Sequence, residues 1–254
     1  MTVDKNEILG DIGNYLRHMK EEGGTGIRIC PADIPVPAEA DSTPAPQAAA
    51  APLDRDAALR EIADRIAACR ECPLAATRPN TVPGGGCLDP DIMFIGEGPG
   101  REEDLQGIPF VGRSGALLDR LIKRMGYTRG QVFIANIVKC RATENYEMQK
   151  DRPPSTEEMS ACIHYLVEQI AIVRPKVLVT LGNTALEGLF GFRGITSKRG
   201  QWLEFEGIPA MPTYHPSFLL RGGGDQGQRF WELWEDMLQV FERLGRTPPG
   251  KGLK

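Results

Sequence analysis

Four short apolar runs, each separated from the next by a helical pattern, constrain the fold of this chain most strongly. The first run, DIMFIGE, is continuously apolar and stops at a stretch of Gly and Pro, as a buried strand does. The last run contains two prolines, so we expect it nearer an edge of the sheet. We predict strands at residues 91–97, 131–139, 176–181 and 208–215.

The segments between these runs have the spacing of amphipathic helices. Ser114 is expected to cap one helix, and the sequence STEE at Ser155 is a capping-box pattern for a longer one. Strands separated by helices favour a parallel sheet covered on both faces. We therefore predict an α/β fold, a three-layer α/β/α sandwich with a central four-stranded, mostly parallel sheet. The predicted helices span residues 54–68, 114–125, 155–173, 184–190 and 229–244.

The first 53 residues differ in composition from the rest. In residues 31–53, 14 of 23 are Pro or Ala, a composition that indicates a semi-extended linker without a core. Before it, residues 6–20 place apolar side chains at helical spacing. We divide the chain into an amphipathic helix and tail (1–30), a Pro/Ala-rich linker (31–53), a folded domain (54–245) and a C-terminal tail (246–254), and we expect the N-terminal extension to be disordered. The helix either packs on its own domain or binds a partner protein.

Charge and hydropathy exclude several classes of protein. The net charge of -4 is concentrated at the start, because residues 1–56 carry -5 and residues 57–254 carry +1. A polyanionic partner is therefore neither required nor excluded. No apolar run approaches the ~20 residues that cross a bilayer, and the N-terminus carries acids where a signal peptide has bases. We expect a cytoplasmic, monomeric protein that does not bind membranes.

Small and hydrogen-bonding residues lie at or near the carboxyl end of each predicted strand. Because the carboxyl ends of parallel strands meet at one edge of a sheet, these residues predict a binding site there. The sequence at this edge does not by itself name a ligand. The residues are Gly96-Glu97-Gly98-Pro99-Gly100, Asn136, Gly182-Asn183 and His215-Pro216-Ser217.

Four of the six cysteines have a spacing that suits a metal centre. Cys69 and Cys72 form a CxxC pair at a helix end, Cys140 follows the second strand, and Cys162 lies in the long helix. Four thiolates suit zinc or an iron–sulfur cluster, whereas the CxxC pair alone is equally consistent with a redox pair. Cys87 has no partner at ligand spacing, so we expect a spare thiol there.

A set of ordered motifs from about Ala58 to Phe241 resembles the family-four uracil-DNA glycosylases, the iron–sulfur branch of the uracil-DNA glycosylase superfamily. Each motif alone is weak, but their order along the chain makes chance similarity improbable. The motifs are CRECPL at 69–74, GEGPGREED at 96–104, GIPFVGRSGALLDRLI at 107–122, NIVKCR at 136–141, PPSTEEMSAC ending at Cys162, and HPSFLLR at 215–221.

The resemblance implies a cofactor and a set of site residues. It implies that Cys69, Cys72, Cys140 and Cys162 bind a [4Fe-4S] cluster. It also implies that Glu97 and Gly98 form the loop at the uracil and the attacking water, that Phe110 stacks on the extruded base, that Asn136 reads its polar edge, and that His215 lies against uracil O2. Ser217 and Arg221 belong to a loop that would enter the DNA minor groove. The family usually has Ala where this chain has Gly98.

The chemistry of base excision explains why these residue types are needed. An amide such as Asn136 matches O4 and N3–H of uracil and mismatches cytosine, whose group at position 4 has the opposite polarity. A neutral His215 can donate to the anionic uracil as it leaves. Of the three histidines, His215 alone lies at a predicted strand end. We take Glu97, Asn136 and His215 as the catalytic residues.

Basic residues on the predicted loops suggest how DNA is held. We expect them to bind phosphates at one sheet edge. They are Arg101, Arg113, Lys139, Arg141, Arg193, Lys198, Arg199 and Arg221.

The sequence therefore predicts a uracil-DNA glycosylase of base-excision repair that acts on single- or double-stranded DNA. Two alternatives stay open. One is a protein that binds uracil or abasic DNA with little or no turnover, which Gly98 makes plausible. The other is a polymerase-associated relative of the same fold, whose N-terminal helix contacts a repair or replication protein.

Overall fold

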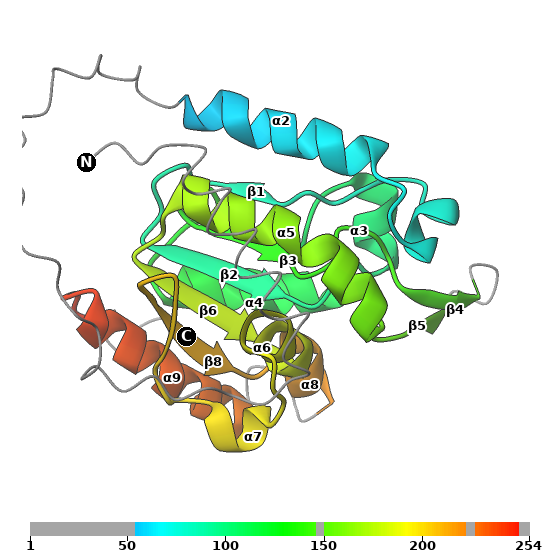
Figure 1. Ribbon diagram of the computed structural model, residues 1–254. Coiled ribbons are helices and arrows are strands. Elements are labelled where there is room, and N and C mark those ends of the chain that lie inside the picture. The colour runs from blue at the N-terminus through cyan, green and yellow to red at the C-terminus, as the bar shows by residue number, and fades with distance from the viewer. Residues whose placement is uncertain (1–53, 146–149, 222–226, 249–254) are drawn as a thin grey trace, which may run out of the picture. The chain divides into compact units, whose positions relative to one another are not determined.

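Four buried strands pair in parallel at the centre of the sheet (Figure 1). The structure is a computed structural model that describes residues 54–145, 150–221 and 227–248. The predicted N-terminal helix and linker lie outside these residues. The strands are β1 (Gly85–Gly86), β2 (Ile92–Gly96), β3 (Phe133–Asn136), β4 (Thr143–Asn145), β5 (Lys150–Asp151), β6 (Val177–Leu181), β7 (Leu203–Phe205) and β8 (Ile208–Thr213).

Helices alternate with these strands, which confirms the predicted α/β class. The α-helices are α2 (Arg55–Ala68), α3 (Arg101–Gln106), α4 (Arg113–Arg124), α5 (Thr156–Val173), α6 (Gly182–Phe190), α7 (Ile195–Lys198), α8 (Pro216–Leu220) and α9 (Gln228–Arg243). Two short 3-10 helices lie at Pro73–Ala76 and Arg129–Gln131. No helix in this part of the chain is both long and apolar enough to cross a membrane.

The main sheet has six strands in the order β1-β3-β2-β6-β8-β7, so the prediction of four strands is wrong. The four predicted strands form its parallel centre, and β1 and β7 add antiparallel edges. β1 consists of two glycines and β7 of three residues, so neither carries an apolar run that a sequence pattern can detect. β8 lies next to the edge, as its prolines predict.

Alternating side chains of the strands build the core between the sheet and its helices. Ile92 and Phe94 of β2 pack with Leu117 and Leu118 of α4 and with Met237 of α9. Helix α5 crosses the front of the sheet in Figure 1, with α2 packed along it. All residues of β2, β3 and β6 are buried, as continuous apolar runs require.

Of the two predicted helix N-caps, the structure has the one at Ser155 but not the one at Ser114. Ser155 caps α5: its hydroxyl accepts from the Glu158 N–H at 3.2 Å, and Glu158 accepts from the Ser155 N–H at 2.8 Å. Ser114 does not cap α4, because the helix begins one residue earlier with Gly112 as its N-cap. No side chain caps α4, but the N–H of Gly112 donates to the Glu103 carboxylate at 2.9 Å, which fixes the residue before the helix.

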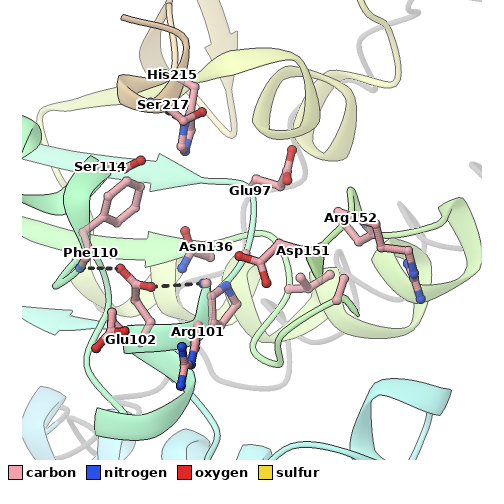
Figure 2. A pocket seen from close by; sticks show the side chains of 18 of the residues that line it. Glu97, Arg101, Glu102, Phe110, Ser114, Asn136, Asp151, Arg152, His215 and Ser217 are labelled. Atoms are coloured by element: carbon pink, nitrogen blue, oxygen red, sulfur yellow. Dashed lines mark hydrogen bonds between the residues drawn. The ribbon is translucent and has the colours of Figure 1, made fainter. Parts of the chain in front are cut away.

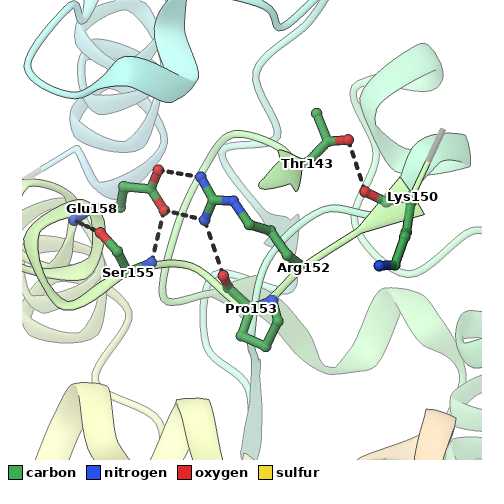
Figure 3. Close-up of polar contacts among 6 residues, drawn as sticks. All are labelled: Thr143, Lys150, Arg152, Pro153, Ser155 and Glu158. Atoms are coloured by element: carbon green, nitrogen blue, oxygen red, sulfur yellow. Dashed lines mark hydrogen bonds and ion pairs between the residues drawn. The ribbon is translucent and has the colours of Figure 1, made fainter. Parts of the chain in front are cut away.

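The β4–β5 hairpin, which the sequence did not predict, is tied to the start of α5 (Figure 3). Arg152 forms a two-pronged ion pair with Glu158 at 2.6 and 2.8 Å. Within the hairpin, the Thr143 hydroxyl donates to the Lys150 carbonyl at 2.8 Å. The hairpin is thereby fixed to the helix that carries Cys162.

The C-terminal helix α9 is clamped to β8 by a buried carboxylate. Asp236 is 1% exposed and receives two hydrogen bonds from Arg199, at 2.8 and 3.1 Å. The Thr213 hydroxyl donates to the same carboxylate at 2.6 Å. The end of β8 is therefore held in place by a side chain more than twenty residues further along the chain.

Gly115, in the first turn of α4, tests how tightly the loop before this helix is packed. A Cβ at this position would lie 2.0 Å from the Phe110 carbonyl oxygen. Ala favours a helix over Gly by about 1 kcal/mol, but a clash with the backbone costs more. We expect Gly115→Ala to lower the free energy of unfolding by about 1–3 kcal/mol in urea titrations. Gly130→Ala, where a Cβ meets nothing within 4 Å, is the matched control; equal stability of the two variants would contradict the packing argument.

Candidate active site

A cavity opens at the carboxyl ends of the parallel strands, where the sequence predicts a site (Figure 2). A second cavity adjoins the first, shares Glu97, His215 and Ser217 with it, and is also lined by Arg221. The structure thus brings all seven predicted base- and DNA-binding residues to one region. Those that line the first cavity are Glu97, Gly98, Phe110, Asn136, His215 and Ser217.

Asn136, the last residue of β3, lies at the base of the cavity with 1% of its surface exposed. Its side-chain oxygen Oδ1 is buried and has no hydrogen-bond partner among the described residues. Since an unpaired buried polar atom costs about 1–3 kcal/mol, this oxygen is suited to accept from a ligand. Gly96 makes the arrangement possible, because a Cβ there would lie 2.5 Å from Asn136 Oδ1 and 2.5 Å from Phe110 Cζ.

Phe110 is held in an uncommon backbone conformation. Its φ angle is +51°, in the left-handed region that a bulky residue rarely adopts. The Arg129 guanidinium donates to the carbonyls of Phe110, at 3.0 Å, and of Pro109. The ring lies 5.8 Å from the His215 ring, centroid to centroid, which is aromatic contact distance, and both rings line the cavity. Strain of this kind, maintained by surrounding contacts, is typical of functional sites.

Glu103 holds this loop from the other side, and the sequence analysis missed it. Its carboxylate accepts from the N–H groups of Val111 and Gly112, both at 2.9 Å, and of Gly100 at 3.1 Å. The side chain is 8% exposed. It stands in an acidic run, REED, that ordinarily indicates a solvated helix face, and the local sequence contains no signal that sets this carboxylate apart.

His215 follows β8 and caps α8 with its ring. The Ser217 N–H donates to Nδ1 at 3.1 Å, so Nδ1 carries no proton and the neutral ring has its hydrogen on Nε2. Burial, with a smaller contribution from the positive charge of Arg221, lowers the pKa of His215 to about 4. The ring is therefore a neutral hydrogen-bond donor across the physiological range.

Glu97 and Gly98 lie where β2 ends. The Thr184 hydroxyl of α6 donates to Glu97 Oε2, which fixes one oxygen of the carboxylate. A Cβ on Gly98 would lie 2.6 Å from Val138 Cγ2. The glycine is therefore matched to a close approach of the buried Val138 side chain.

The structure corrects the predicted set of phosphate-binding residues. Lys139 and Arg141 are 1% and 3% exposed, and Arg199 is bound to Asp236, so these three do not present their charges to a ligand. Arg101 and Arg113 line the first cavity and Arg221 lines the second. Lys139 and Arg141 were expected on an exposed loop, but the segment that follows β3 is buried.

The four predicted ligand cysteines line one small cavity between α2, α5 and the segment after β3. Cys87 does not line it. Within the described residues, no three His, Cys, Asp or Glu side chains converge closely enough to hold a single metal ion. A multinuclear cluster binds each thiolate through a different metal atom, so its ligands need not converge on one point. Four cysteine side chains gathered at one cavity form a donor set of the kind that binds zinc or an iron–sulfur cluster.

Hydrogen-bond donors and positive charge surround these sulfur atoms. Arg78 Nη1 donates to Cys140 Sγ at 2.9 Å, and the Lys139 N–H donates to Cys162 Sγ at 3.3 Å. Burial raises the pKa of the Cys140 and Cys162 thiols, so thiolates here need compensating positive charge. The donor set therefore fits an anionic, thiolate-bound group.

Comparison with known proteins identifies the class to which this fold and site belong. The family model described as the uracil DNA glycosylase superfamily matches residues 83–238, which include the strands and the cavity. The chain belongs to this superfamily and, within it, to the type-4 uracil-DNA glycosylases. The family resemblance noted in the sequence is thereby confirmed.

Three type-4 uracil-DNA glycosylases illustrate the similarity. The protein of Thermotoga maritima is 43% identical over 178 residues, 69% of this chain and 90% of its own length. That of Sulfurisphaera tokodaii is 42% identical over 200 residues, 75% of this chain and 86% of its own. That of Archaeoglobus fulgidus is 38% identical over 200 residues, 75% of this chain and 96% of its own.

The lowered pKa of His215 can be measured directly. We expect its ring signal in NMR spectra of histidine-labelled protein to titrate near pH 4, against about 6.5 for an exposed histidine. Between these values the unfolded chain binds the proton more strongly, so His215 reduces stability as the pH falls from 6.5 toward 4. The chain has three histidines, and His215→Gln assigns the signal by removing it. A midpoint near 6.5 would contradict the neutral-donor interpretation.

Proposed function

We propose that this protein hydrolyses the N-glycosidic bond of deoxyuridine in DNA, releasing uracil and leaving an abasic site in base-excision repair. Membership of the type-4 uracil-DNA glycosylases supports this activity. The observation that carries the proposal is the buried, unpartnered Oδ1 of Asn136 at the base of a cavity flanked by Phe110 and His215.

Base recognition follows from the two ends of the Asn136 amide. Oδ1 accepts from N3–H of uracil, and the amide nitrogen donates to O4. Cytosine lacks the N3 hydrogen and has an amino group at position 4, so it leaves both ends unsatisfied. Phe110 stacks on the extruded base, which returns ~1–3 kcal/mol of the energy of unstacking.

Bond cleavage depends on stabilising the leaving group. The N1–C1′ bond breaks with its electron pair on uracil, and negative charge develops at O2. The Nε2–H of His215 donates to that oxygen as the charge forms, an effect of about 10²–10³ in rate for one such donor. A neutral donor suits this role because its hydrogen remains in place throughout the neutral pH range.

Glu97 and Gly98 complete the hydrolysis. A water oxygen bonds to C1′ of the cationic sugar, and the carboxylate of Glu97 receives the proton that the water loses. Thr184 occupies Oε2, so we assign Oε1 to the water. Gly98 allows the backbone to come close to the base.

DNA binding is assigned to the loop that follows His215. Ser217 and Arg221 contact the DNA backbone at the minor groove, with Arg101 and Arg113 binding phosphates on the opposite side of the cavity. We assign the activity to a glycosylase domain of residues 54–245 in a cytoplasmic monomer. The segment before the linker, predicted from its sequence to be an amphipathic helix, is proposed to bind a repair or replication protein.

Cys69, Cys72, Cys140 and Cys162 would hold a [4Fe-4S] cluster, which supplies a covalent brace between α5, the end of α2 and the segment after β3. The chain's own residues prepare this site: Arg78 donates to Cys140, and the Lys139 N–H donates to Cys162. We assign the cluster a structural role, because the cysteine cavity does not include Glu97, Asn136 or His215.

Excision from a labelled single-stranded oligonucleotide with one uracil tests the activity. We expect multiple turnovers from the wild-type protein and a loss of about 10²–10³ in rate for both Asn136→Ala and His215→Ala, measured as alkali-labile abasic sites. Affinity for thymine-containing DNA should be unchanged, since neither side chain contacts phosphate. Tight binding of uracil DNA without abasic product would instead identify a sequestering protein.

Replacing one cysteine tests the metal site. We expect Cys140→Ser to lose bound iron and to unfold at a lower temperature, because the brace between α5 and the segment after β3 is broken. Iron content and thermal unfolding are the two measurements. Cys87→Ser, whose thiol lies outside the cavity, should retain both properties. A Cys140→Ser protein without iron but with wild-type stability would contradict a bracing role.

A further inference from the structure

Lys139 is a buried cation that the proposed reaction does not use. Its side chain is almost fully buried, with 1% of the residue exposed. Nζ donates to the backbone carbonyl of Asn136 at 2.9 Å and to Gln169 Oε1 at 2.8 Å. One of its two acceptors therefore belongs to the residue that lies at the base of the active-site cavity.

The backbone of the same residue is bound on the other side. The Lys139 N–H donates to Cys162 Sγ at 3.3 Å, and its carbonyl accepts from the Val82 N–H at 2.8 Å. Gln169 extends the network, since its amide nitrogen donates to the Pro83 carbonyl at 2.8 Å. Lys139 thus joins the end of β3, helix α5 and the segment before β1.

The position of this charge favours a functional role over a purely structural one. Among the described residues, the hydrogen-bond acceptors of Lys139 Nζ are the Asn136 carbonyl and Gln169 Oε1, and neither is a carboxylate. An isolated buried ammonium is costly, and an apolar side chain would fill the same volume without that cost. The side chain lines the cysteine cavity, where thiolates would supply the missing negative charge.

We propose that Lys139 is a positioning residue that couples base recognition to the cysteine site. The Lys139 side chain fixes the backbone carbonyl of Asn136. It thereby keeps the side-chain amide of Asn136 in position to hydrogen-bond to the edge of uracil. Because the Lys139 side chain also lines the cysteine cavity, the position of Asn136 depends on the charge of the cysteine site. This inference rests on the proposed function, because it presupposes that Asn136 reads the base.

The experiment compares Lys139→Met and Gln169→Met with Thr180→Val. Lys139→Met removes the amine that donates to Asn136 and Gln169, and Gln169→Met removes only the second of these acceptors. Neither substitution changes the Asn136 side chain. Thr180 is a fully buried residue of β6, and its variant controls for replacing a buried polar group. Iron content and unfolding temperature are measured for every protein.

The decisive readout is binding. Each protein is titrated with an oligonucleotide carrying a non-hydrolysable, 2′-fluorinated deoxyuridine and with the matched deoxycytidine oligonucleotide, because Asn136 is proposed to distinguish these two bases. We expect Lys139→Met to reduce the preference for uracil over cytosine, and kcat/KM for excision, by about 10- to 100-fold, as is typical when a supporting residue is lost. Affinity for the deoxycytidine oligonucleotide should stay at the wild-type value. Gln169→Met should show a smaller loss of the same kind, and remains informative where Lys139→Met does not fold.

A double-mutant cycle with Asn136→Ala separates positioning from general destabilisation. If Lys139 acts through Asn136, Lys139→Met costs little once Asn136 is alanine. Additive losses, or wild-type selectivity in both Lys139→Met and Gln169→Met, would overturn this inference while leaving the proposed function intact. A wild-type protein that neither excises nor prefers uracil would overturn both.

Discussion

The pairing of β2 with β3 continues beyond the two strands, and the active site depends on this continuation. After Asn136 the Ile137 N–H donates to the Gly96 carbonyl at 3.0 Å, and the Val138 N–H donates to the Glu97 carbonyl at 3.2 Å. These bonds keep the turn after β2 beside the turn after β3. Asn136 and Glu97 therefore face one cavity although they lie 39 residues apart in the sequence. If the pairing ended at Gly96 and Asn136, the turns that follow β2 and β3 would be free to separate.

Close approaches of the backbone give this site its rigidity. Gly96 and Gly115 lie where a Cβ would collide with Phe110, and Glu103 and Arg129 hold the ends of the loop that carries it. The positive φ of Phe110 persists because these contacts leave the loop no alternative. The aromatic ring is consequently in place before a base arrives, which reduces the entropy lost on binding.

The sequence predicted the centre of this fold and missed its edges, for identifiable reasons. The runs around β2 and β6 are apolar throughout because both faces of a parallel strand are covered. Gly85–Gly86 has no side chains from which to infer pairing, so an edge strand was missed. Local patterns placed His215 at the end of a strand and Asn136 near the end of another, where the cavity lies, although β3 ends at Asn136 and not at Lys139 as predicted. They failed for Lys139 and Glu103, because whether a charged side chain points into the protein depends on residues distant in the sequence.

The clamp between α9 and β8 also has a consequence for how the protein is made. Synthesis proceeds from the N-terminus, so Thr213 and His215 leave the ribosome before Asp236. Until that carboxylate arrives, Arg199 and the Thr213 hydroxyl lack the acceptor that fixes the end of β8. A nascent chain can therefore form its central strands early, but it completes its leaving-group site only after its final helix has been translated.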